Sequence, residues 1–110
     1  MTNSKQKGKR GELEVVHLLK EAGFAARRGQ QFKGTSDSPD IIHSLPVGQN
    51  LEVKRVEKLN VQKALDQSMS DKAPEDIAVV VHRSSRTEWK VTLYLDDYLD
   101  IMKMIDVNII

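Results

Sequence analysis

Apolar residues recur at helical spacing in three stretches of the chain. The first runs from about Gly8 to Ala22 and is followed by Gly23, a residue that commonly ends a helix. A second helix is expected from Asn60 to Lys72, and a short third one from Asp97 to Met104. The second helix would turn one apolar stripe inward, formed by Val61, Ala64, Leu65, Ser68 and Met69.

Shorter segments have the composition and the alternation of β-strands. They are Phe24–Arg27, Asp40–His43, Leu51–Val56, Asp76–His82 and Glu88–Leu95. The fourth segment is apolar on both faces, which is typical of a central strand. The fifth alternates like a strand covered on one side, with Trp89, Val91, Leu93 and Leu95 inward. The order helix, three strands, helix, two strands, helix predicts an α/β domain.

The composition is that of one ordinary domain covering residues 1–110, with residues 1–7 expected to form a flexible basic arm. No apolar run approaches the roughly 20 residues that span a membrane, and no apolar signal core follows the basic N-terminus. We therefore expect an intracellular protein; a phage-encoded protein in a bacterial host would fit. Because the chain has no cysteine, a metal would be held by oxygen ligands or histidines.

The net charge of +1 says little about partners, but the charges are segregated along the chain. Acidic residues gather between Asp96 and Asp100, whereas basic residues form several clusters that could make one phosphate-binding face. The candidate DNA contacts are Lys7, Lys9, Arg10, Arg27, Arg28, Lys33, Arg55, Arg83 and Arg86. Solvated loops without a ligand would explain the same clusters equally well.

Two charged residues lie on one face of the third expected strand. Side chains alternate along a strand, so Glu52 and Lys54 point the same way and Leu51, Val53 and Arg55 point the other. A surface ion pair would account for this pattern, and such pairs contribute only about 0–1 kcal/mol.

A second carboxylate could join them. Asp40 opens the preceding strand, and the turn-forming segment 46–50 would return the chain antiparallel, which places Asp40 beside Glu52. Two adjacent carboxylates repel each other unless a cation is bound, and hard oxygen ligands suit Mg²⁺ or Mn²⁺. The alternative for Asp40 is a turn aspartate after proline.

The first helix supplies a third acid. At about 100° per residue, Glu12 falls on the inward stripe with Val15 and Val16, whereas Glu14 falls on the polar face with His17. A carboxylate beside a buried stripe needs a partner, and a metal site would provide one. A glutamate favoured by the helix dipole is the competing interpretation.

These motifs, in this order, resemble the PD-(D/E)XK nucleases, and among them the archaeal and phage Holliday junction resolvases. The resemblance is carried by Lys7-Gly8, Gly11-Glu12, the segment from Leu18 to Phe24, Pro39-Asp40 and Glu52-Val53-Lys54, and it covers the first half of the chain. In the second helix Asn60, Lys63 and Gln67 share a face, and related phage enzymes are similar in having a glutamine there.

The resemblance implies a restriction-endonuclease-like fold, with a mixed sheet flanked by helices, and Mg²⁺-dependent hydrolysis of DNA in which Mn²⁺ can substitute. Asp40, Glu52 and the carbonyl of Val53 would hold the metal, and Glu12 would act through a metal-bound water. Lys54 would orient or deprotonate the attacking water. Secondary candidates are Gln67, Lys63 and a loop hydroxyl, Ser36 or Thr35, with Asp37 interpreted as a turn residue.

The expected substrate is branched DNA, in first place a four-way junction, which requires two sites and hence a homodimer. The candidate interface residues lie near Trp89, in the last helix and in the tail 107–110. A nuclease for flaps, duplex ends or single strands is the rival enzyme. A catalytically silent nucleic-acid-binding module is the rival of another class, and the presence of Glu12, Asp40, Glu52 and Lys54 together argues against it.

Overall fold

The computed structural model describes residues 4–29 and 39–106. Their elements follow the expected order: α1 (Ser4–Glu21), β1 (Ala26–Arg28), β2 (Ile41–His43), β3 (Gln49–Arg55), α2 (Val61–Asp71), β4 (Ile77–Arg83), β5 (Lys90–Thr92) and α3 (Leu95–Asp106). Helix α1 starts at Ser4 and therefore includes residues 4–7 of the segment that we expected to form a flexible arm. None of the helices among the described residues is long and apolar enough to cross a membrane.

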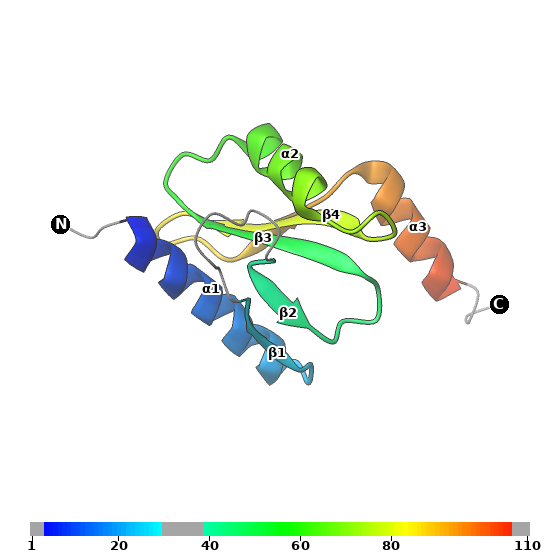
Figure 1. Ribbon diagram of the computed structural model, residues 1–110, viewed down its shortest axis with the longest axis horizontal. Coiled ribbons are helices and arrows are strands. Elements are labelled where there is room, and N and C mark those ends of the chain that lie inside the picture. The colour runs from blue at the N-terminus through cyan, green and yellow to red at the C-terminus, as the bar shows by residue number, and fades with distance from the viewer. Residues whose placement is uncertain (1–3, 30–38, 107–110) are drawn as a thin grey trace.

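Strand β4 is the centre of a mixed sheet, as its two apolar faces predict. It pairs in parallel with β3, Leu51 facing Val79, and antiparallel with β5, Val81 facing Val91. Helix α1 covers one face of this sheet and α2 covers the other (Figure 1). The arrangement explains why Ala78, Val79 and Val80 are all almost fully buried.

Two apolar clusters hold the helices on the sheet. Val15 and Val16 of α1 pack against Leu51 and Val53 on one face. On the other face, Ala64 and Leu65 of α2 pack against Val80. Ser68, fully buried, donates a hydrogen bond to the backbone carbonyl of Asn50 at 2.8 Å, which satisfies its polar group inside the core. The predicted inward stripe of α2 is thus confirmed except at Met69, which is 44% exposed.

Strand β2 lies antiparallel beside β3, as expected, because Asp40 contacts Val53 and His43 contacts Gln49, but the described residues form no backbone ladder between the two strands. Within the described residues β2 pairs with β1, Arg27 facing Ile42, and β3 pairs with β4. The connection between β2 and β3, residues 44–48, contains bends but no hydrogen-bonded turn. Asp40 therefore reaches β3 in a different way from the one predicted.

The first strand begins two residues later than expected because the end of α1 uses the intervening backbone. Gly23 has a φ of 101°, in the left-handed region, and its N–H donates to the carbonyl of Lys20. The N–H of Phe24 donates to Leu19 at 3.0 Å. These bonds satisfy carbonyls of the last helical turn, so the chain becomes extended only at Ala26.

The last strand is shorter than its alternating pattern predicts. Trp89 and Leu93 pack against the core, but β5 covers only Lys90–Thr92, and Val91 is 62% exposed. Leu95, expected inside the strand, instead begins α3 and is 68% exposed. The described elements cover only part of β5, which is an edge strand. The alternation of its residues could not show that position in the sheet.

Candidate active site

Glu52 and Lys54 lie on the face of β3 that α2 covers. The Lys54 Nζ atom is 3.3 Å from Glu52 Oε2, and Glu52 is only 4% exposed. A surface ion pair is therefore excluded as the explanation of the pattern. A buried carboxylate carries a desolvation cost that a single lysine only partly offsets, and further positive charge at the site would offset more of it.

Asp40 stands directly before β2 and reaches β3 with its side chain. Its Oδ2 atom accepts a hydrogen bond of 2.9 Å from the backbone N–H of Val53. The N–H and the C=O of one residue point to the same side of a strand, so the Val53 carbonyl faces the edge where Asp40 lies. The carboxylate thus occupies a position that a neighbouring strand would otherwise fill.

Gly29 makes this placement of Asp40 possible. Its N–H donates to the carbonyl of Asp40 at 2.9 Å, which joins the end of β1 to the start of β2. A Cβ at Gly29 would overlap the backbone carbonyl of Pro39, so a side chain there would push the two segments apart. The glycine fixes the backbone that carries Asp40.

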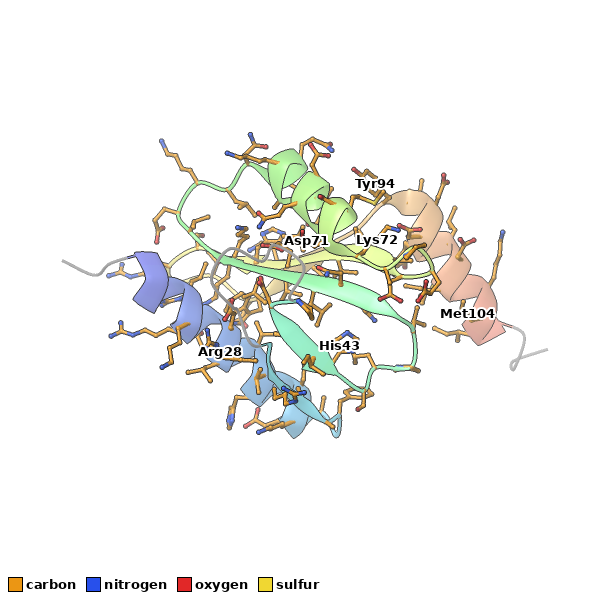
Figure 2. All side chains as sticks on the ribbon, in the orientation of Figure 1. Arg28, His43, Asp71, Lys72, Tyr94 and Met104 are labelled. Atoms are coloured by element: carbon orange, nitrogen blue, oxygen red, sulfur yellow. The ribbon has the colours of Figure 1, made fainter. Side chains whose placement is uncertain are left out.

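Glu12 approaches the same place from α1. It is 7% exposed, as its position on the inward stripe predicts, and its Oε1 accepts a hydrogen bond of 2.8 Å from Arg28 Nε. Figure 2 shows Arg28 where β1 runs beside α1. We expected Arg28 to contact DNA, but the structure places its guanidinium against a carboxylate of the candidate site.

The electrostatics show that these groups form one cluster. Burial, together with repulsion from Asp40, raises the pKa of Glu52 to about 7 against the opposing effect of Lys54. Burial also raises the pKa of Asp40, although the Val53 N–H and Lys54 lower it. Burial raises the pKa of Glu12 too, the hydrogen bond from Arg28 lowers it, and Asp40 raises it. Asp40 therefore interacts with the other two acids.

This cluster predicts an unusual pH dependence of stability. A carboxyl whose pKa is raised to about 7 in the folded state binds a proton that the unfolded chain, with a pKa near 4.5, has released. Without divalent metal, the free energy of unfolding should therefore fall by up to a few kcal/mol as pH rises from about 4.5 to 7. Urea unfolding at pH 5 and pH 8 measures the effect.

The matched variants for this prediction are Glu52→Gln and Glu88→Gln. Glu88 is exposed, so its replacement should leave the pH dependence as it is in the unmodified chain. Glu52→Gln should reduce it markedly. Equal slopes in the two variants would show that Glu52 is not protonated near neutral pH.

The donor set fits a hard divalent cation. Asp40 and the Val53 carbonyl offer oxygen atoms at the edge of β3, and Glu52 offers its carboxylate from the adjoining face. Oxygen is the donor type that Mg²⁺ prefers. In the part of the chain that the structure describes, no group of three or more Asp, Glu, His or Cys side chains could hold a metal ion by itself. The set inferred from the resemblance needs only two such side chains, with Glu12 acting through water.

The sequence interpretation missed one acid, Asp71, the last residue of α2. It is half-buried, and its charge raises the pKa of both Asp40 and Glu52. Figure 2 shows it next to β3, and it lines a groove of about 630 Å³ with Pro39 and Asn50. A signal was present, because Lys63, Gln67 and Asp71 follow one another at intervals of four residues and so share a face of α2.

The basic residues divide into two groups. Lys9, Arg10, Arg27 and Arg86 are exposed, as are the secondary candidates Lys63 and Gln67. Lys7 belongs to α1. Lys33, Thr35, Ser36 and Asp37 lie outside the described residues.

Arg55 and Arg83 have another role, because both contact Glu14 of α1. Arg83 Nη2 is 2.9 Å from Glu14 Oε1, and Arg55 Nε is 3.4 Å from Glu14 Oε2. The Arg83 guanidinium also lies 5.5 Å from the ring centre of Trp89. Glu14, expected on the polar face, thus ties α1 to β3 and β4, and this ion cluster holds the helix that carries Glu12.

Comparison with solved structures identifies this arrangement of elements. Hjc, a Holliday junction resolvase from the archaeal hyperthermophile Archaeoglobus fulgidus, aligns with a TM-score of 0.53 over 77% of this chain and 75% of that one. The fold is that of this resolvase. The restriction-endonuclease-like fold expected from the sequence is confirmed. Sequence identity is 23%, and neither a protein-family model nor a curated protein matches the chain.

Proposed function

We propose that the chain is a Mg²⁺-dependent endonuclease that hydrolyses phosphodiester bonds in branched DNA, with the four-way junction as its main substrate. The observation that carries the proposal is the convergence of Asp40, Glu52, Glu12 and Lys54 at the edge of β3. The resolvase fold, which matches a protein acting on Holliday junctions, supports it. Mn²⁺ should substitute for Mg²⁺.

The residues would divide the chemistry as follows. Asp40, Glu52 and the Val53 carbonyl would hold the cation, which supplies charge neutralisation and a lowered pKa of bound water. Glu12, positioned by Arg28, would accept a hydrogen bond from a water in the site. Lys54 lies beside Glu52 and would place its ammonium against the attacking water and the phosphate oxygens.

A four-way junction presents two equivalent strands, whereas the described residues of one chain form one such site. We therefore propose that the active form is a homodimer with two sites related by a two-fold axis. Exposed Lys9, Arg10 and Arg27, on or beside α1, would contact the phosphates flanking the cleaved strand.

The test is a cleavage assay with four DNA substrates of matched sequence: junction, flap, duplex and single strand. With Mg²⁺ we expect junction cleavage to exceed duplex cleavage at least about tenfold, and excess EDTA should abolish it for all substrates. Preference for flaps or single strands would favour the rival nuclease. Binding of DNA without cleavage in Mg²⁺ or Mn²⁺ would favour the silent binding module.

A further inference from the structure

Helix α3 exposes an apolar face that the described parts of the chain do not cover. Viewed along its axis, Leu95, Tyr98, Leu99, Met102 and Ile105 fall within one broad sector. They are 68%, 46%, 44%, 37% and 51% exposed, respectively. A helix normally buries such a face, so this one is a candidate contact surface.

The helix is held at its start and extends away from the sheet. The Gln62 amide of α2 donates to the Tyr94 hydroxyl at 3.1 Å, just before α3 begins. Figure 2 shows Tyr94 between α2 and the start of α3, and Met104 near the other end of α3. Figure 1 shows α3 at the end of the molecule opposite the N-terminus of α1. The apolar face is therefore accessible to a second molecule.

The charges beside this face are arranged for pairing with an identical helix. Asp96 and Asp100 lie in the first half of α3, and Lys103 lies in its last turn, all along one flank of the apolar sector. When two copies of a helix pack antiparallel about a two-fold axis, each flank meets the same flank of the other copy. The N-terminal half of one flank then lies beside the C-terminal half of the other. Lys103 would then face the partner's Asp96 and the partner's Asp100.

We propose that α3 is a self-association surface, on which two copies of this chain pack their α3 helices antiparallel with Leu99 and Met102 at the two-fold axis. DNA does not suit this surface, because Asp96, Asp97 and Asp100 would repel its phosphates. A second copy would bury the apolar face and would place each Lys103 near the partner's Asp96 and the partner's Asp100. The inference stands on the surface of α3 and specifies the interface of the homodimer proposed above.

Cysteine cross-linking tests the geometry, because the chain has no native cysteine. A single cysteine in place of Met102 should meet its own copy across the axis and form a disulfide-linked dimer under mild oxidation. Met104→Cys is the matched control on the opposite side of the helix, where the side chain is 56% exposed against 37% for Met102. We expect Met102→Cys to cross-link at least about tenfold faster, although it is the less exposed position. Equal rates, or faster linkage at position 104, would overturn the proposed packing.

Sedimentation velocity tests the association itself. Leu99→Glu should raise the dimer dissociation constant by roughly a hundredfold or more, because it buries a charge at the axis in both copies. Leu18→Glu is the control, since Leu18 lies on α1 and is 45% exposed against 44% for Leu99. Far-UV circular dichroism should be unchanged in both variants.

Two results would reject the interface: an unmodified chain that stays monomeric up to about 100 μM, or equal weakening by Leu99→Glu and Leu18→Glu. Neither result depends on catalysis. If the chain forms a dimer but does not cleave DNA, the α3 interface stands and the nuclease proposal is rejected. If the chain is a monomer that cleaves junctions, the nuclease proposal stands and the α3 interface is rejected.

Discussion

Replacing Asp40 by Asn, or Glu52 by Gln, should lower the rate of DNA cleavage by roughly a thousandfold or more. Each variant keeps the shape of the side chain but removes a negative charge from the edge of β3 that would hold the cation. The Asp40→Asn variant would also lose the charge that strengthens the hydrogen bond from the Val53 N–H. The loss of activity should appear in the single-turnover rate constant at saturating enzyme.

DNA binding should survive in the same variants, or become tighter, because phosphate is repelled by one negative charge fewer in each site. Fluorescence anisotropy in excess EDTA, where the site holds no cation and no cleavage occurs, measures this with a labelled junction. Glu88→Gln is the control for removing an exposed acid, and it should leave both quantities within about twofold. Cleavage by Asp40→Asn at a rate close to that of the unmodified chain would reject the proposed cation site.

Much of the fold could be predicted because the decisive patterns are local. The apolar run of β4 indicated a central strand, and the helical stripe of α1 placed Glu12 inward. The alternation in β3 put Glu52 and Lys54 together. These features depend on a residue and its near neighbours in sequence, which the periods of helix and strand fix.

The partners of strands and charges could not be predicted, because they depend on contacts distant in sequence. Nothing local in the sequence shows that β2 pairs with β1. The sequence therefore suggests that Asp40 approaches Glu52 through a strand ladder, whereas the Asp40 carboxylate accepts a hydrogen bond from the Val53 N–H. Arg55 and Arg83 were interpreted as phosphate contacts because their common partner, Glu14, is distant in sequence, 69 residues away in the case of Arg83. Charge in a sequence identifies a basic residue but not the acid that it meets.

Lys54 should be the most sensitive basic residue of the site. Its ammonium lies 3.3 Å from Glu52, and its charge lowers the pKa of Glu12, Asp40 and Glu52 together. Lys54→Ala should lose about a hundred- to a thousandfold in single-turnover rate, since a directed positive charge is removed both from the acids and from the phosphate.

Lys54→Arg separates charge from position. An arginine keeps the positive charge but presents a planar, bulkier group that does not deprotonate in this pH range. Only 31% of the Lys54 side chain is exposed, so the larger group must displace Glu52 or turn away from it. We therefore expect Lys54→Arg to stay within about tenfold of Lys54→Ala, whereas Lys90→Arg, at an exposed position of β5, should cleave like the unmodified chain. Recovery of Lys54→Arg to within a few-fold of the unmodified rate would mean that charge alone suffices, and Lys54 would then act as a general electrostatic contact rather than as the group that orients the attacking water.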